Sequence, residues 1–283
     1  MQHALAEYRK YVAAMLSQLG DKNAALEATQ IVALETKLAQ LQWTKVANRD
    51  PVKTYNKYPL AKLNQLAPSY AWNDYLAAAN LHGKVTYLVI SQPSFISGFN
   101  QLLNDVPVAS WQAYFRWQVL NSFAPYLSAE FAEQHFAFYG TVLSGVPQNK
   151  PRWQRGLVVV ENNLGEALGE LYVAKYFPPQ NKVKMEQLVA NLMTAYRQSI
   201  ESLEWMSPAT KVKAKEKLAA IMLKIGYPEH WRDYSSLVIK PQQLINNLQA
   251  AAQFEYQRNI NKLGKPVDRA EWGMTPQTVN AYY

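Results

Sequence analysis

The sequence predicts a mainly α-helical protein, and three observations carry this prediction. Apolar residues recur at three- and four-residue steps along most of the 283 residues, which is the spacing of one helix face. Only 11 glycines and 15 prolines interrupt the chain, fewer obligatory turns than a many-stranded sandwich needs. Hydrophobic residues make up 49% of the sequence, an ordinary share for a globular protein, so intrinsic disorder is excluded.

The chain opens with two predicted helices. The first covers His3–Leu19, and Gly20 follows it as a residue that can close the C-terminal end. Asp21 or Asn23 can cap the second helix, whose apolar stripe runs over residues 26–41. Both helices therefore have a chemical start or stop signal in addition to their periodicity.

A turn-rich region follows. Pro51 disfavours helix at the residue before it and ends the second stripe. A short helix is expected around Leu60–Leu66. Lys84–Ile90 alternates apolar and polar side chains and is the one strand expected in this part of the sequence.

Helices dominate the rest of the sequence. Ser207 followed by Pro208 is a strong start signal, because the hydroxyl caps the first turn and proline has no N–H to leave unpaired there. Another helix is expected from Pro241 to about Leu263, and Thr278–Tyr283 is expected to be extended. The remaining predicted helices are Phe95–Leu103, Val108–Leu120, Ala129–Leu143, Arg152–Tyr176, Lys184–Leu203 and Pro208–Lys224.

Charge does not indicate a nucleic-acid partner. The chain has 29 Lys+Arg against 21 Asp+Glu, a formal net charge of +8. Its densest basic stretch, residues 211–217, places lysines at every second position, which spreads them around a helix. That arrangement favours a solvated helix surface, and no nucleic-acid partner is predicted. Binding driven by the net charge remains a rival hypothesis.

Candidate chemistry is sparse. The absence of cysteine excludes disulfides, thiolate zinc sites and cysteine nucleophiles. The four histidines, His3, His82, His135 and His230, lack the i, i+4 spacing of a helical zinc pair. Glu229 and Asp233 are spaced like an acidic pair on a zinc helix, but they follow a helix-ending Gly-Tyr-Pro. We therefore predict no catalytic residue and no metal ligand in this chain.

Aromatic and aliphatic runs indicate a core and no membrane span. Trp111, Tyr114 and Trp117 fall on neighbouring helical turns, a pattern more typical of a core than of a stacking platform for bases or sugars. The longest aliphatic run is Leu157–Val160, far below the roughly 18 residues that cross a bilayer. No transmembrane segment and no signal peptide are expected in the sequence.

Five phrases occur in order along the sequence. They are Leu34–Ala39, Arg49–Asn56, Trp153 with Gly165–Val173, Leu203–Met206 with Ile225–Pro228, and Glu271–Trp272 with Asn280–Tyr283. Together they resemble the neprilysin and endothelin-converting-enzyme family of zinc peptidases. That family's signatures are a Leu-Glu-x-x-Leu-Ala helix, Arg-Asp-Pro before Tyr-Asn, a Trp…Gly-x-Ala-x-Gly-x-Leu-Tyr-Val helix, an Ile-Gly-Tyr-Pro turn and Asn-Ala-aromatic-Tyr. The resemblance covers essentially the whole chain.

The resemblance implies a domain organisation. Residues 1–240 would form the helical N-terminal cap domain, and residues 241–283 the first helix and first strand of a thermolysin-like catalytic domain. The family's His-Glu-x-x-His zinc motif is expected beyond Tyr283. The chain is therefore expected to bind no zinc and to be inactive alone, whereas the full-length parent would use zinc.

The resemblance also implies a function and partners. The parent would be an endopeptidase cleaving oligopeptides, with this segment enclosing and size-selecting the substrate. Asn280 and Ala281 are the residues expected to contact it. The expected partners are peptide substrates and the missing C-terminal catalytic segment. The absence of cysteine suggests a bacterial member, expected in the periplasm or otherwise outside the cytoplasm. The alternative is a helical interaction or scaffold module without peptidase activity.

Overall fold

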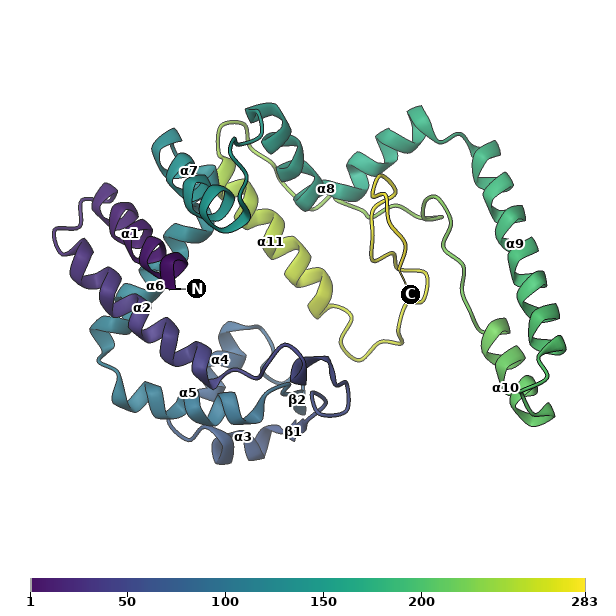
Figure 1. Cartoon of the computed structure of the whole chain (residues 1–283), viewed down its shortest axis with the longest axis horizontal. Helices are drawn as coiled ribbons and strands as arrows, with labels where there is room; N and C mark the ends of the chain where they lie inside the picture. The colour runs from purple at the N-terminus through teal and green to yellow at the C-terminus, as the bar shows by residue number, and fades with distance from the viewer. Residues whose placement is uncertain (1, 283) are drawn as a thin grey trace. The chain divides into compact units, whose positions relative to one another are not determined.

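The computed structural model describes residues 2–282 and confirms the mainly α class (Figure 1). The chain divides into two compact units, Met1–Lys150 and Pro151–Tyr283. The predicted boundary near Lys240 falls inside the second unit. The assignment of residues 1–240 and 241–283 to two domains of a longer protein remains a prediction.

The first unit combines helices with one small sheet. Its elements are α1 (Gln2–Gln18), α2 (Ala24–Leu41), the 3-10 turn η1 (Ala47–Arg49), β1 (Lys57–Pro59), α3 (Leu60–Leu66), α4 (Trp72–Ala78), β2 (Tyr87–Val89), α5 (Pro93–Asp105), α6 (Val108–Phe123), the 3-10 turn η2 (Ala124–Tyr126), α7 (Ala129–Phe136) and the π-helical turn η3 (Ala137–Val142). The helix expected over Ala129–Leu143 is thus α7 continued by a π turn. Helix α4 was missed.

The core of the first unit lies between α1, α2 and α6, with η3 against it. Trp117 is fully buried at its centre, and the ring of Tyr11 stacks on Phe138 with 5.1 Å between centroids. The aromatic stripe of α6 is therefore core, as predicted. Gly20 ends α1 with a positive φ of 84°, and the N–H groups of Gly20 and Asp21 return to the last turn of the helix.

The predicted strand is confirmed as β2, and the structure adds the partner that the sequence pattern missed. β1 and β2 pair antiparallel, with Lys57 opposite Val89. The Asn56 amide donates to the carbonyls of Lys53 and Ile90 at 2.7 and 3.0 Å, which ties the turn before β1 to the end of β2. Asn56 of the Tyr-Asn phrase thus has a structural role here.

The first unit contains a partly buried carboxyl group, that of Glu35. Glu35 accepts hydrogen bonds from the Tyr8 hydroxyl at 3.0 Å and the Gln118 amide at 2.9 Å. The Trp117 indole N–H in turn donates to the Tyr8 oxygen at 2.9 Å. Burial raises the pKa of Glu35, a shift that these hydrogen bonds only partly oppose.

Replacing Glu35 by glutamine is expected to stabilise the chain at neutral pH. Because the folded pKa of Glu35 lies above its ordinary value of 4.5, its stabilising contribution is complete below that value and is lost as the pH rises through the raised pKa. Glutamine stays neutral and keeps an acceptor oxygen. Urea unfolding at pH 4.5 and 7.5 should show a gain for Glu35→Gln only at the higher pH. Glu133 is an exposed acid of α7 and serves as the control. An equal gain in the free energy of unfolding for Glu133→Gln would contradict this account.

The second unit contains α8 (Arg152–Tyr176), α9 (Pro179–Ser202), α10 (Pro208–Ala219) and α11 (Leu244–Ile260). Ser207 caps α10 as predicted, because its hydroxyl accepts the Thr210 N–H at 3.2 Å. Helix α11 is three residues shorter at each end than expected, and two other boundaries differ by five residues. Helix α9 begins at Pro179, five residues before Lys184, and α10 ends at Ala219, so the stretch up to Lys224 is not helical.

Helix α8 has a local break that its sequence pattern does not reveal. Leu164 has φ −133° and ψ 33°, which are not helical values. The helix predicted over Arg152–Tyr176 has the predicted outer bounds, but it consists of two helical stretches joined at this kink. Among residues 2–282, no helix is both long and apolar enough to cross a membrane.

Candidate functional site

The predicted substrate-contacting residues lie on a C-terminal segment, Gly273–Tyr282, that runs against α8. A Cβ atom at Gly165 would lie 2.8 Å from Thr275 Cγ2, and one at Gly169 would lie 2.8 Å from Gln277 Oε1 and 2.9 Å from Pro276 Cδ. The Gln277 amide donates to the Gly165 carbonyl at 3.0 Å. The glycines of the Gly-x-Ala-x-Gly phrase therefore permit close packing of this segment on the helix.

The same segment folds back on itself. The Tyr282 hydroxyl accepts the Gly273 N–H at 3.0 Å, so the two ends of the segment meet. Between them, Asn280 and Ala281 are exposed, and the Asn280 side-chain oxygen accepts the Ala281 N–H at 2.8 Å. The asparagine side chain thus holds a local turn.

The extended conformation expected for Thr278–Tyr283 does not become a strand in the described part, and Tyr283 lies outside it. Within residues 278–282 the backbone makes short-range bonds, such as Asn280 N–H to the Thr278 carbonyl at 3.1 Å. A strand needs a neighbouring strand to pair with, and β1 and β2 pair only with each other. The assignment of this segment as the first strand of a catalytic domain remains a prediction.

Asn280 and Ala281 line a pocket of about 760 Å³. One wall is the stretch Ala220–Gly226 that follows α10; helix was expected there up to Lys224. The lining combines apolar side chains, including Met222, Leu223 and Trp272, with cations such as Lys217 and Lys224. Sequence reasoning missed this wall because residues 220–224 carry no glycine or proline to signal that the helix has ended.

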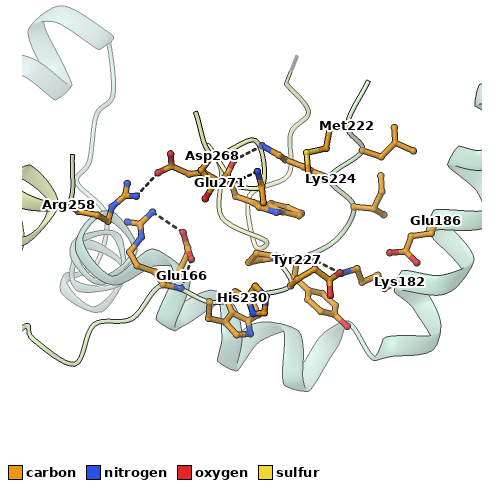
Figure 2. Close-up of a pocket in the computed structure, with 18 of the residues that line it drawn as sticks. Glu166, Lys182, Glu186, Met222, Lys224, Tyr227, His230, Arg258, Asp268 and Glu271 are labelled. Carbon is orange, nitrogen blue, oxygen red and sulfur yellow. Dashed lines mark hydrogen bonds and ion pairs between the residues drawn. The ribbon is translucent and has the colours of Figure 1, made fainter. Parts of the chain in front are cut away.

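A second pocket, of about 410 Å³, shares residues 222–225 of this stretch with the first and is shown in Figure 2. Lys182 crosses its rim: the ammonium donates to the Tyr227 carbonyl at 3.1 Å, pairs with Glu229 at 2.8 Å and lies 4.3 Å from the centre of the Tyr227 ring. The hydrogen bond from Lys182 lowers the pKa of Glu229. Glu229 is therefore engaged in an ion pair.

Glu229 and Asp233 are spaced in sequence like an acidic pair on a zinc helix, but they are not arranged as metal ligands. Glu229 binds Lys182, and the Asp233 carboxylate accepts the Ser235 N–H at 2.8 Å within its own turn. Across residues 2–282, no three His, Cys, Asp or Glu side chains gather closely enough to hold a metal ion.

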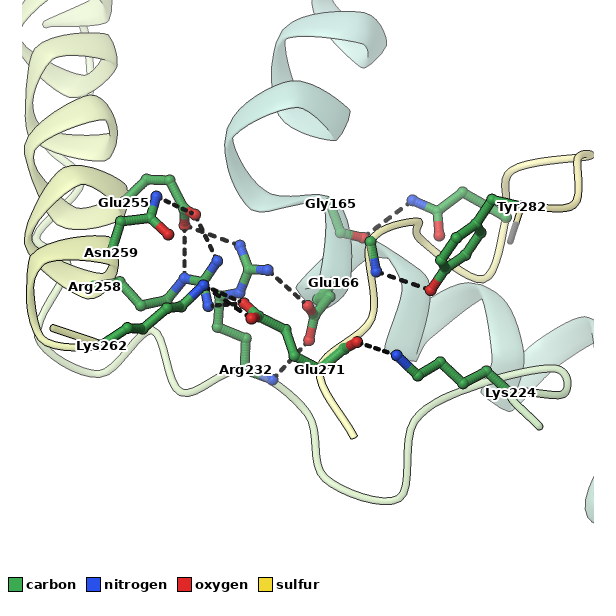
Figure 3. Close-up of polar contacts among 12 residues, drawn as sticks. Gly165, Glu166, Lys224, Arg232, Glu255, Arg258, Asn259, Lys262, Glu271 and Tyr282 are labelled. Atoms are coloured by element: carbon green, nitrogen blue, oxygen red, sulfur yellow. Dashed lines mark hydrogen bonds and ion pairs between the residues drawn. The ribbon is translucent and has the colours of Figure 1, made fainter. Parts of the chain in front are cut away.

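Six charged side chains form an ionic cluster next to this pocket: Glu166, Arg232, Glu255, Arg258, Lys262 and Glu271 (Figure 3). Arg232 joins Glu166 of α8 at 2.8 Å to Glu255 of α11 at 3.1 Å. The Arg232 backbone N–H also donates to Glu166 at 2.9 Å. The cluster links α8, the loop before α11, α11 itself and Glu271, which lies two residues before the C-terminal segment. Sequence reasoning did not bring these residues together.

Comparison with curated proteins gives relatives of one kind. The endothelin-converting enzyme homolog of Locusta migratoria is 26% identical over 298 residues, covering 99% of this chain and 41% of the relative. Neprilysin-3 of Drosophila melanogaster is 27% identical and covers 99% of this chain and 38% of the relative. The chain therefore spans about two fifths of the length of these curated relatives.

Solved structures agree. The zinc metalloprotease Zmp1 of Mycobacterium tuberculosis, in complex with an inhibitor, is 40% identical with a TM-score of 0.91; the similarity covers all of this chain and 43% of that one. PepO from Lactobacillus rhamnosis has a TM-score of 0.83 at 23% identity, a likeness of fold. The family model described as peptidase family M13 matches residues 1–228. That match covers most of the sequence and agrees with the ordered phrases found in it, so this chain belongs to peptidase family M13, the neprilysin-like zinc metallopeptidases.

Proposed function

We propose that this chain is the N-terminal part of a neprilysin-like zinc metalloendopeptidase that cleaves oligopeptides. The observation that carries the proposal is the match of residues 1–228 to peptidase family M13, together with relatives that are more than twice as long. In this proposal the chain encloses the substrate and selects it by size, and the chain is inactive alone. The peptidase would act in the periplasm or elsewhere outside the cytoplasm, as the resemblance implies.

The described residues do not themselves form a zinc site, so no catalytic step is assigned to them. The histidines are isolated from one another in sequence, and Glu229 and Asp233 are engaged elsewhere. We therefore propose that the zinc ligands belong to a further C-terminal catalytic segment of the same protein. Zinc bound there would supply a water activated for attack on the peptide carbonyl.

Exposed apolar side chains in the second unit support the proposal that a further catalytic segment binds there. No residue of α9 is buried, although the helix carries Leu188, Leu192 and Tyr196. Trp153 and Trp205 belong to the matched phrases, and they are 68% and 77% exposed. Large exposed apolar patches mark interaction surfaces. We propose that the C-terminal catalytic segment covers these side chains.

The domain assignment belongs to the same proposal: residues 1–240 as helical cap and residues 241–283 as the beginning of the catalytic domain. The family match ends at residue 228, close to this boundary. Asn280 and Ala281 would then lie on an edge beside which an extended peptide binds as an added strand. The small side chain of Ala281 leaves room for the peptide backbone, and the Asn280 amide can both donate and accept.

The test compares two proteins. One is this chain alone, and the other is the longer protein obtained by following the reading frame to the length of the relatives. The longer protein should hydrolyse oligopeptides, lose that activity to a chelator and regain it with zinc, whereas the isolated chain should do none of these. Absence of hydrolysis by the zinc-loaded longer protein, with peptides of several lengths, would reject the proposal and favour a scaffold module.

Within the same experiment, Asn280→Ala should lower kcat/KM by an amount corresponding to about 1–3 kcal/mol, because one or two hydrogen bonds to substrate are lost. Zinc content should be unchanged. Asn246→Ala on α11 is the matched control, since its amide bonds to Gln243 within that helix start. Identical kinetics for the Asn280 variant and the parent enzyme would remove Asn280 from the substrate site.

A further inference from the structure

Glu271 is bonded through both its carboxylate and its backbone carbonyl within the ionic cluster (Figure 3). One of its oxygens accepts from Arg258 at 2.5 Å and from Lys262 at 2.6 Å, and the other accepts from Lys262 at 2.9 Å. Its backbone carbonyl accepts from the Lys224 ammonium. Three cations from two parts of the second unit therefore converge on one residue, two residues before the C-terminal segment begins.

Arg258 is itself held in place. Its guanidinium donates to Glu255 at 2.9 and 2.6 Å, one helical turn earlier on α11. Glu255 also binds Arg232, which binds Glu166 of α8. The positive and negative side chains alternate from α8 through α11 to Glu271, so each charge has an opposite neighbour.

The connection that leads to Glu271 has no regular structure. Helix α11 ends at Ile260, and residues 261–270 form turns. Such a connection fixes the position of the residues after it only weakly. Downstream of Glu271, by contrast, the Gly273 N–H binds the Tyr282 hydroxyl, and Gln277 binds the Gly165 carbonyl. The C-terminal segment therefore has local order of its own, and Glu271 is where that order is joined to α11.

We propose that Glu271, bound by Arg258 and Lys262, is a positioning residue that sets the C-terminal segment against α11 and so aligns Asn280 and Ala281 for substrate. The proposal rests on the proposed function for its consequence in catalysis, but the positioning itself is a property of this chain. Glu271 acts through the segment and does not touch substrate.

The Glu271 carboxylate is ionised at neutral pH and well below it. Hydrogen bonds from Lys262 and Arg258 lower its pKa to about 2, so the carboxylate stays ionised well below neutral pH. Salt weakens exposed ion pairs, and Glu271 is partly exposed, so high ionic strength should loosen the segment in the unsubstituted chain.

The first measurement is hydrogen exchange of this chain. In Glu271→Gln, the amides of Gly273, Thr278 and Asn280 should exchange about five- to tenfold faster, because two or three exposed ion-pair contacts are lost. The urea midpoint of the first unit should not move. Glu271→Asp keeps the charge and should restore exchange to within about twofold. Glu216→Gln, which breaks an exposed pair with Lys213 on α10, is the matched control.

The second measurement is kinetic and uses the longer zinc-loaded protein. Glu271→Gln should lower kcat/KM about three- to tenfold, mainly through a higher KM, and Glu271→Asp should recover most of the loss. Zinc content should stay at the level of the parent enzyme.

Two results would overturn the proposal. Unchanged exchange of Gly273–Tyr282 in Glu271→Gln would show that the ion pairs do not position the segment. Faster exchange with unchanged kcat/KM, while Asn280→Ala still impairs hydrolysis, would show that the position does not matter for substrate. A longer protein without peptidase activity would reject the proposed function instead, and the exchange experiment would still decide the role of Glu271 within this chain.

Discussion

Replacing Trp117 by alanine is expected to destabilise the first unit by about 3–5 kcal/mol, the range measured for large-to-small changes at buried aromatic residues. Trp117 is fully buried, and its ring lies edge-on to Tyr8 and Tyr11 with centroids 6.1 and 5.3 Å away. Its removal leaves a cavity and also takes the indole donor from the Tyr8 oxygen, within the network that satisfies Glu35.

Urea unfolding followed by circular dichroism measures this change. Trp205→Ala is the control, because that indole is 77% exposed and its loss should change the free energy of unfolding by no more than about 0.5 kcal/mol. Trp117→Phe should fall between the two, since it keeps most of the apolar volume but loses the donor. If both alanine variants unfolded at the same urea concentration, the core would be wrongly placed.

The contrast between these tryptophans shows what helical periodicity predicts. Trp117 became core because its partners, α1 and α2, are in the same unit and were predicted as amphipathic helices. Trp111 is buried beside Phe99 of α5. Trp153 lies in the helix predicted by the apolar spacing of Arg152–Tyr176, yet it is exposed. Periodicity identifies an apolar face but does not tell which segment covers it.

Short strands and irregular stretches were harder to predict than helices. β1 spans three residues and includes Pro59, so its sequence has no alternation to detect, and its pairing with β2 joins residues about thirty positions apart. The stretch after Ala219 departs from helix without a glycine or proline. Long-range contacts accompany that departure: Arg269 donates to the Ala220 carbonyl at 2.8 Å, and Lys224 donates to the Glu271 carbonyl.

The residues of the candidate site also differ in how far the sequence predicts them. Asn280 and Ala281 were found only through the resemblance, because an asparagine and an alanine have no distinctive spacing. The ionic cluster was not found at all, since Glu166 and Arg232 are 66 residues apart and ion pairs leave no periodic signal. The glycines of α8, by contrast, stand out in the sequence, and their physical role becomes clear only from the segment that packs on them.

These glycines give a prediction in which one helix serves as both test and control. Leucine at Gly169 would collide with Pro276 and Gln277, since even a Cβ there lies under 3 Å from both side chains. The Pro276 ring has little freedom to move aside, so the C-terminal segment should detach from α8. Gly156 lies in the part of α8 before the break at Leu164, and a Cβ there has nothing within 4 Å, so leucine meets open space.

The two substitutions should therefore change the free energy of unfolding in opposite directions. Gly156→Leu should stabilise the chain by roughly 0.5–1 kcal/mol, because glycine is a poor helix residue and leucine a good one. Gly169→Leu gains the same helix propensity but should lose about 1–3 kcal/mol to overpacking, together with the bond from Gln277 to the Gly165 carbonyl. Hydrogen exchange separates the outcomes: protection of Thr278 and Asn280 should be lost in Gly169→Leu and kept in Gly156→Leu. Equal protection in both would mean that Gly165–Gly169 does not hold the segment carrying Asn280 and Ala281. The glycine phrase would then need a role other than packing this segment.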